Sequence, residues 1–315
     1  MTILILGGDD DEHAMHMLDY LHQGGYDAEL FDTRHFPARM QLTFDPKRET
    51  GAIRLPGGRS LDILRIRSVY WRCYHGIPET RLRDPEQAFI AVNDARGLLE
   101  SLLIRTPARW VNGWAAYQLH RTKPVQLAIV ASLGVPTPET LLSNDPEAVL
   151  AFGRRHPRSI FKPVQGGAHA RRLTEAHLTG RNLVNLAHAP VTLQEEVPGT
   201  NIRAFVAGER VLACEVRTVE LDFRDDPSPR ISPHSLASGV EASCLRIARA
   251  LDLRWTGIDF RLTPEGRYVF LEANPSPMFL GFERQTGLPL TESLAALLVG
   301  PGVSHDRPPS PSTAR

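Results

Sequence analysis

The segment YVFLEANPSP, residues 268–277, constrains the fold of this chain more than any other. Four apolar residues predict a buried strand, and Glu272 and Asn274 then interrupt it two positions apart, just before a proline. Residues i and i+2 of a strand project from the same face, so a carboxylate and an amide are predicted to lie side by side. A buried polar group without a partner costs about 2–7 kcal/mol, so this pair is expected to hold a ligand.

The preceding strand supplies a third polar group. The sequence WTGIDFRLTPEGRYVFLEANP predicts two strands around the turn signal TPEG. A tight turn centred between Glu265 and Gly266 places Asp259 opposite Glu272, on the same face of the hairpin. Facing carboxylates repel unless a cation lies between them, and Asp, Glu and Asn oxygens are hard ligands suited to Mg²⁺. The pattern predicts a metal site of Asp259, Glu272 and Asn274; a solvated strand end with ordinary surface acids is the alternative.

The composition excludes several classes of protein. The chain has 315 residues, enough for two or three lobes, and its 36 basic and 36 acidic residues give a formal net charge of zero. Bulk binding of nucleic acid or of an anionic membrane is therefore not expected. Cys73, Cys214 and Cys244 are scattered without a CxxC pattern, as in reduced, cytoplasmic proteins. The start, MTILILGG, is not typical of a signal peptide, and no apolar run approaches a membrane span.

The order of the predicted elements indicates an α/β chain of several units. It starts with a strand–helix–strand pattern and becomes rich in strands from about residue 191. We expect units over residues 1–113, 114–190 and 191–302, followed by a disordered tail rich in Pro and Ser over residues 303–315. No GxGxxG follows the first strand and no GxxxxGK occurs, so a Rossmann or P-loop nucleotide site is not expected.

Two lysines are candidates for binding an anion. Lys162 ends an apolar strand in SIFKPVQGG, and Gly166 and Gly167 after it permit a close approach of the backbone to a phosphate. Lys123 lies about forty residues earlier, in HRTKPV. Each lysine taken alone is equally consistent with a surface position whose stem covers apolar groups.

Two further patterns bear on a nucleotide site. Gln194 and Glu195, in LQEEVPG, follow an apolar strand and precede a Pro-Gly turn, as in a hinge whose backbone is free to pair with a base edge. Arg203 and Arg217 lie on consecutive strands. A two-residue turn at Gly208-Glu209 puts these arginines on opposite faces, whereas a bulged loop of odd length puts them on one face, and the sequence leaves both open. His13 and His16 are one helical turn apart without a third ligand, so we expect a solvated helix face.

The order of these pieces resembles the ATP-grasp superfamily of ligases. Lys123, Lys162 with Gly-Gly, and the segments LQEEV, NIR, CEVR, GIDF and FLEANPSP follow one another as in that superfamily, over roughly Trp114 to Gly300. The first lobe, with AELFDTRHFPARMQLTFD and SVYWRCYHG, and the end, GRYVFLEANPSPMFLGFERQTGLPLTESLAALL, resemble the microviridin-type graspetide ligases. Those enzymes crosslink ribosomally made peptides. The resemblance implies an ATP-grasp fold with an N-terminal βαβ lobe, a small central lid and a C-terminal lobe rich in strands.

The resemblance also implies roles for single residues. ATP-binding residues would be Lys123, Lys162, Gly166, Gly167, Gln194, Glu195, Val197 and Asn201. Asn201 stands where the superfamily often has an acid for the ribose hydroxyls, and an amide accepts more weakly there. Mg²⁺, expected as two ions, would be held by Asp259, Glu272 and Asn274. Arg217, with Arg203, would stabilise the phosphoryl group and the tetrahedral intermediate.

This set of residues fits the activation of a carboxylate. Transfer of the γ-phosphoryl group of ATP gives an acyl phosphate, whose leaving group is phosphate, and an amine or hydroxyl then attacks the acyl carbon. We therefore expect an ADP-forming, cytoplasmic ligase that matures a ribosomally made precursor peptide. A small-molecule amino-acid or dipeptide ligase and an inactive nucleotide-binding regulator are the alternatives. The sequence leaves open the substrate, ester or amide as product, and the oligomeric state, for which a homodimer is one expectation.

Overall fold

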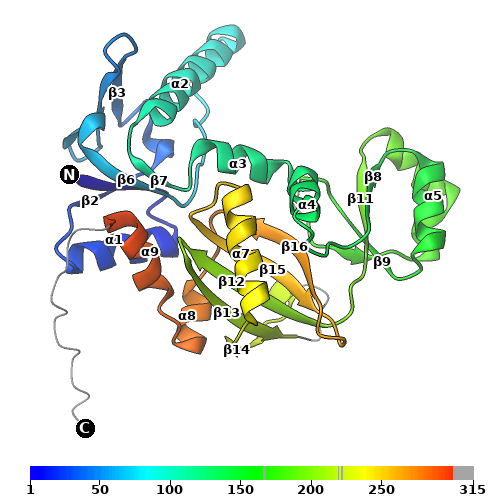
Figure 1. The fold of residues 1–315 in the computed structure, drawn as a ribbon. Helices are drawn as coiled ribbons and strands as arrows, with labels where there is room; N and C mark the ends of the chain where they lie inside the picture. The colour runs from blue at the N-terminus through cyan, green and yellow to red at the C-terminus, as the bar shows by residue number, and fades with distance from the viewer. Residues whose placement is uncertain (166–167, 219, 221–222, 301–315) are drawn as a thin grey trace.

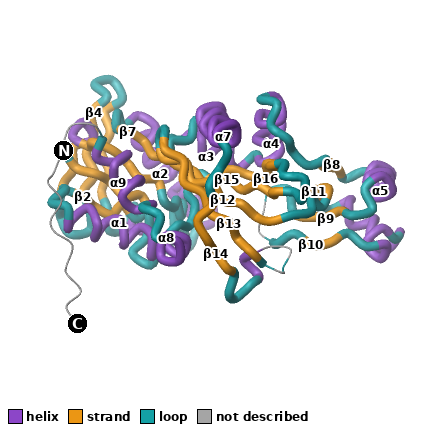
Figure 2. Tube along the Cα trace, turned by 60° about the horizontal axis from the view of Figure 1, so that its bottom comes forward, coloured by secondary structure: helices purple, strands orange, loops and turns teal. Residues whose placement is uncertain are grey.

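The computed structural model describes residues 1–165, 168–218, 220 and 223–300. Within these residues the strands form four sheets. Figures 1 and 2 show a five-stranded sheet in the middle of the molecule, the N-terminal lobe on one side of it and a smaller, four-stranded sheet on the other. The predicted tail, residues 303–315, lies outside the described residues, as do Gly166 and Gly167.

The N-terminal lobe is built on a parallel sheet. Its strands, in spatial order, are β2 (Ala28–Phe31), β1 (Thr2–Leu6), β6 (Ile66–Trp71) and β7 (Arg109–Val111). An antiparallel sheet beside it comprises β3 (Gln41–Asp45), β4 (Thr50–Arg54) and β5 (Ser60–Asp62). Helices α1 (Glu12–Gln23) and α2 (Pro85–Arg105) begin after Asp11 and Asp84, whose carboxylates accept hydrogen bonds from backbone amides of the first turn.

The four-stranded antiparallel sheet, which we call the lid sheet, follows two short helices, α3 (Trp114–Arg121) and α4 (Lys123–Ser132). Its strands, in spatial order, are β10 (Arg171–Arg172), β9 (Ser159–Lys162), β11 (Val191–Glu195) and β8 (Thr140–Ser143), and α5 (Pro146–Arg155) and α6 (Gly180–Leu183) lie between them in the chain. The second unit was expected to end at residue 190, but β11 pairs with β8 and β9. We therefore propose that the second unit extends through Glu195, because the hydrogen bonds of β11 lie within the lid sheet.

The central sheet is antiparallel. In spatial order it contains β14 (Arg230–His234), β13 (Arg210–Arg217), β12 (Thr200–Ala207), β15 (Trp255–Leu262) and β16 (Tyr268–Asn274), and helix α7 (Ser238–Ala250) precedes β15. Alternate residues of each strand enter two different cores, as the period of a strand requires. Ile202 and Ala204 pack with α4 and α7, whereas Phe205 packs with the C-terminal helices α8 (Leu280–Thr286) and α9 (Leu290–Val299).

The C-terminal helices join the central sheet to the N-terminal lobe. Figure 1 shows α9 beside α1, although the two helices lie at opposite ends of the chain. His13 on α1 accepts a hydrogen bond from the Phe279 amide at the start of α8, with 3.0 Å between Nε2 and N, and its side chain is only 8% exposed. The prediction of a solvated helix face for His13 is therefore wrong. His16 contacts the Thr291 hydroxyl at 2.9 Å.

Candidate active site

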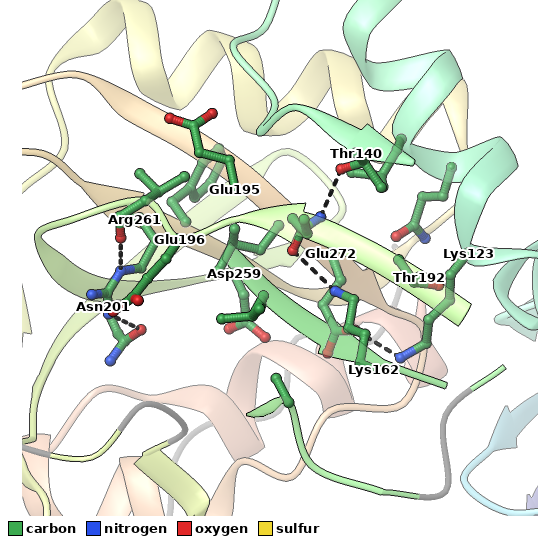
Figure 3. A pocket seen from close by; sticks show the side chains of 18 of the residues that line it. Lys123, Thr140, Lys162, Thr192, Glu195, Glu196, Asn201, Asp259, Arg261 and Glu272 are labelled. Atoms are coloured by element: carbon green, nitrogen blue, oxygen red, sulfur yellow. Dashed lines mark hydrogen bonds and ion pairs between the residues drawn. The ribbon is translucent and has the colours of Figure 1, made fainter. Parts of the chain in front are cut away.

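A pocket lies between the lid sheet and the central sheet, and Figure 3 shows its polar side chains pointing toward one another from both. Helix α4 contributes Lys123 at its first residue. The pocket gathers most of the residues predicted for the site: Lys123, Lys162, Gln194, Glu195, Val197, Asn201, Arg203, Asp259 and Glu272. The structure thus brings together residues that are up to about 150 positions apart in the sequence.

The two acids of the hairpin face each other as predicted, with Asp259 on β15 paired to Glu272 on β16. The turn was predicted in the wrong place. Phe260 pairs with Phe270 and Leu262 with Tyr268, and the Thr263 amide donates to the Arg267 carbonyl, so a three-residue turn is centred on Glu265. A β-bulge between Asp259 and Phe260 then adds one residue on β16 and restores the predicted pair.

Each carboxylate is paired with a cation. The Arg203 guanidinium donates two hydrogen bonds to Asp259, at 2.7 Å from Nε and 2.6 Å from a terminal nitrogen. Phe223 and Phe282 flank the Arg203 guanidinium, with ring centroids 5.3 and 5.2 Å from it. The bidentate geometry fixes both partners of the Arg203–Asp259 pair at the pocket wall.

The Lys123 ammonium lies 2.8 Å from Glu272 Oε2. Burial alone would raise the pKa of the Glu272 carboxyl. The charge and hydrogen bond of Lys123 outweigh that effect and lower the pKa below its ordinary value. The charges of Arg203 and Lys162 act in the same direction. Glu272 is therefore ionised at neutral pH, as a ligand of a divalent cation must be.

The lid sheet adds a polar chain at the opposite wall of the pocket. Lys162 Nζ donates to Gln194 Oε1 at 3.1 Å, and Gln194 Nε2 donates to the Thr140 hydroxyl at 3.0 Å (Figure 3). Gln194 is only 2% exposed, so its amide is fixed by these two contacts. Glu195, the next residue, accepts a hydrogen bond from the Glu139 amide at 3.3 Å. The structure places Lys162 at the wall of the pocket.

Two functional candidates, Arg261 and Gln126, were missed by the sequence analysis. Arg261 donates to the Val197 carbonyl at 3.1 Å and to Asn201 Oδ1 at 2.8 Å, and burial lowers its pKa. It lies two residues after Asp259 on β15, so the strand period could have placed it on the same face. The buried Gln126 also lines the pocket, without a local signal. Glu196, the last acid of the predicted hinge segment LQEEV, lines the pocket too and pairs with Arg172 at 3.0 Å.

Two predicted residues do not enter the pocket. Ala207 pairs with Arg210, so the turn between β12 and β13 is the two-residue Gly208-Glu209 turn and Arg217 lies on the opposite face from Arg203. The Arg217 side chain is 71% exposed and pairs with Glu215 at 3.0 Å. Its predicted contact with the phosphoryl group has no support in this arrangement.

Asn274 is the second predicted residue that does not line the pocket. Its side-chain oxygen accepts a hydrogen bond from the Ser276 amide at 2.9 Å, which caps the loop after β16. In the described part of the chain, no cluster of three His, Cys, Asp or Glu residues is suited to a metal ion. The donor set that does fit Mg²⁺ is the facing pair Asp259 and Glu272, since this ion takes one or two carboxylates and completes its shell with phosphates and water.

A pocket between two antiparallel sheets, lined by two lysines and by two facing carboxylates, is the arrangement expected of an ATP-dependent ligase of the ATP-grasp class. The RimK-like ATP-grasp domain matches residues 121–298, more than half of the chain, and the chain belongs to this family. It is an ADP-forming ligase, and ligases of this class use ATP and Mg²⁺. Every helix in the described ranges is too short or too polar to cross a membrane.

Solved structures of ATP-grasp ligases match nearly the whole chain. The ATP-grasp ligase PsnB complexed with minimal precursor is 31% identical, with a TM-score of 0.84, and the match covers 94% of this chain and 97% of that one. The macrocyclase MdnC from Microcystis aeruginosa MRC, bound with the precursor peptide MdnA, is 24% identical and shares the fold, with a TM-score of 0.83 and coverage of 95% and 100%.

Curated relatives match a smaller part of this chain. A probable alpha-L-glutamate ligase of Legionella pneumophila strain Corby is 28% identical over 199 residues, which cover 57% of this chain and 63% of that protein. One from Picosynechococcus is 30% identical over 152 residues, covering 43% of this chain and 48% of that protein. The chain thus spans about half to just under two thirds of the length of these relatives.

Proposed function

We propose that this ligase activates a side-chain carboxylate of a ribosomally made precursor peptide and joins it to an amine or hydroxyl of the same peptide. The observation that carries the proposal is the match to PsnB, an enzyme complexed with its precursor, along 94% of this chain. A match of this extent includes the N-terminal lobe. The family match begins only at residue 121, and it supports the ligase chemistry but does not identify the substrate.

The residues of the pocket have distinct roles in this proposal. Lys123 and Lys162 bind phosphate oxygens of ATP, because theirs are the ammonium groups at the pocket wall. Gln194 and Glu195, at the end of β11, and Val197, in the segment that leads to the central sheet, line the adenine site. Asn201, whose amide oxygen is held by Arg261, faces the ribose.

Asp259 and Glu272 hold Mg²⁺, which we propose as two ions. When bound, the metal neutralises charge on the transferred phosphoryl group. Arg203 remains fixed at Asp259 and presents its guanidinium to the oxyanion that forms when the amine or hydroxyl attacks the acyl carbon. Lys123 would exchange the Glu272 carboxylate for a phosphate oxygen of ATP, which would leave Glu272 to hold the metal.

The second candidate is the addition of a free amino acid, and the names of the curated relatives favour it. Mass spectrometry separates the two functions. The purified enzyme is incubated with ATP, Mg²⁺ and a peptide encoded beside its gene that contains a repeat rich in Thr, Asp or Glu. Crosslinking removes one water, about 18 Da, for each bond formed. Free glutamate is included in a parallel reaction, in which an adding enzyme increases the mass of its acceptor by one glutamate residue.

Loss of water that requires both ATP and Mg²⁺ supports the proposal. A gain of mass, or consumption of ATP with glutamate and a small-molecule acceptor alone, would replace it with the second candidate. The variant Glu272→Gln should form no product, whereas Glu265→Gln, altered at the exposed turn of the same hairpin, should crosslink like the wild type.

A further inference from the structure

Helix α4 is attached to the edge of the central sheet by a buried amide. Gln126 is only 2% exposed, and its side chain makes two hydrogen bonds to one residue of β16. Nε2 donates to the Ala273 carbonyl at 2.9 Å, and the Ala273 amide donates to Oε1 at 2.8 Å. Because β16 is an edge strand, these backbone groups face away from β15, and Gln126 satisfies them as a neighbouring strand would.

The same helix and the same strand carry the ion pair of the pocket. Lys123 lies three positions before Gln126, on the same side of α4, and Glu272 directly precedes Ala273. Two contacts therefore lie side by side between α4 and β16. One is the ion pair of Lys123 and Glu272 at 2.8 Å, and the other is the pair of hydrogen bonds between Gln126 and Ala273. The buried contact thus joins the helix and the strand that carry the two partners of the ion pair.

The bulge in β16 gives this contact a second consequence. The extra residue of the bulge is Leu271, next to Glu272, and a bulge interrupts the ladder and redirects the side chains beside it. Gln126 holds the backbone immediately after the bulge. Without it, the backbone of Ala273 would lose both outer hydrogen bonds, and the direction of the Glu272 carboxylate would be less well defined.

The contact is more specific than helix packing requires. Val130, one turn further along α4, is fully buried and packs against the central core through apolar groups alone. A buried amide is costly unless it is paired, and both the nitrogen and the oxygen of the Gln126 amide are paired with Ala273, the residue after Glu272.

We infer that Gln126 is a positioning residue of the catalytic site: through Ala273 and α4 it holds Glu272 and Lys123 in the arrangement that receives magnesium and nucleotide. The inference rests on the proposed roles of Lys123 and Glu272. Groups that orient metal ligands typically change metal affinity 10–100-fold when they are removed, so we expect at least a tenfold loss.

The test measures binding of ADP at a series of Mg²⁺ concentrations, by calorimetry, and the melting temperature of the ligand-free protein. The variant is Gln126→Leu, which removes both hydrogen bonds at similar volume. The matched control is Thr256→Val. Thr256, on β15, is fully buried, and its hydroxyl donates to the Asn274 carbonyl of β16 at 2.8 Å. Thr256 does not line the pocket.

Both variants should melt at lower temperature than the wild type. Only Gln126→Leu should need roughly tenfold more Mg²⁺ for the same ADP affinity. In the presence of Glu272→Gln, adding Gln126→Leu should cause little further loss, since the two act on one group. If Gln126→Leu does not fold, Gln126→Met, whose unbranched chain follows the path of glutamine, replaces it in the same measurements.

Wild-type dependence on Mg²⁺ in a folded Gln126 variant, with a lowered melting temperature, would mean that the residue is purely structural and would overturn the inference. If Glu272→Gln itself binds ADP and Mg²⁺ like the wild type, the proposed metal site fails. The proposed site stands and the inference alone fails if Glu272→Gln weakens binding but Gln126→Leu does not.

Discussion

Acidification should unfold this protein partly through His13. This residue is almost completely buried between α1 and the start of α8, where its Nε2 accepts a hydrogen bond from the Phe279 amide. Only the neutral ring has an acceptor nitrogen, so protonation breaks this contact. Burial, together with the positive charge of Arg72, lowers the pKa of His13 from 6.5 to about 4, although Asp11 and Glu12 act in the opposite direction.

The sign and size of the effect follow from these two values. Between pH 6.5 and pH 4 the unfolded chain binds a proton at this site and the folded chain does not, so the free energy of unfolding decreases as the pH falls. The stabilisation is complete above pH 6.5. A difference of this size in pKa corresponds to about 3 kcal/mol, lost progressively down to about pH 4.

The assay is unfolding by urea at several pH values from 8 to 4. His13→Gln keeps an acceptor for the Phe279 amide but does not titrate, so the difference between wild type and variant isolates this residue. We expect the wild type to lose about 3 kcal/mol more than His13→Gln across the range, and His16→Gln, on the same helix, to retain that loss. Parallel curves for wild type and His13→Gln would refute the reasoning.

Three further predictions concern the pocket. Lys162→Ala should abolish ATP turnover with an unchanged circular dichroism spectrum, because it removes an ammonium group from the phosphate end of the site; ADP release at the wild-type rate would contradict this assignment. In a Mg²⁺ titration, Glu272→Gln should lower the rate of ADP release far more than Glu265→Gln, because only Glu272 faces Asp259. Equal rates for the two variants would exclude the metal site. Arg203→Ala should lower the rate of ADP release at least about a hundredfold, as loss of an oxyanion donor does, whereas Arg217→Ala, on the opposite face, should stay within about twofold of wild type; the reverse order would restore the role first predicted for Arg217.

The hairpin at the site was predictable from sequence because its pattern is local. Alternation and the turn signal placed Asp259 opposite Glu272, and the structure confirms this pair. The agreement depends on two compensating features. The turn is centred half a residue earlier than predicted, and the bulge adds one residue to β16. A bulge has no reliable signature in a single sequence. Asn274 keeps the predicted register, opposite Gly257, but its side-chain oxygen accepts a hydrogen bond from the Ser276 amide, a local contact that alternation does not encode.

Contacts between distant segments were not predictable in the same way. The partner of Gln126 lies 147 positions along the chain, and that of His13 lies 266 positions along it. Both side chains are polar residues on amphipathic helices, and the helical pattern assigns such residues to solvent. Their burial follows from how α4 and α1 dock on other parts of the molecule, which periodicity does not encode. The faces of Arg203 and Arg217, by contrast, needed only the length of one turn.

The route of the carboxylate oxygen tests the proposed chemistry most directly. The precursor peptide is prepared with ¹⁸O in its side-chain carboxylates and incubated with the enzyme, ATP and Mg²⁺, and the inorganic phosphate and nucleotide are analysed by mass spectrometry. If an acyl phosphate forms, the bond between carbon and the labelled oxygen breaks when the amine or hydroxyl attacks, and each crosslink delivers one ¹⁸O atom to inorganic phosphate together with one ADP. Label in AMP, or crosslinked peptide without label in phosphate, would contradict the proposed mechanism.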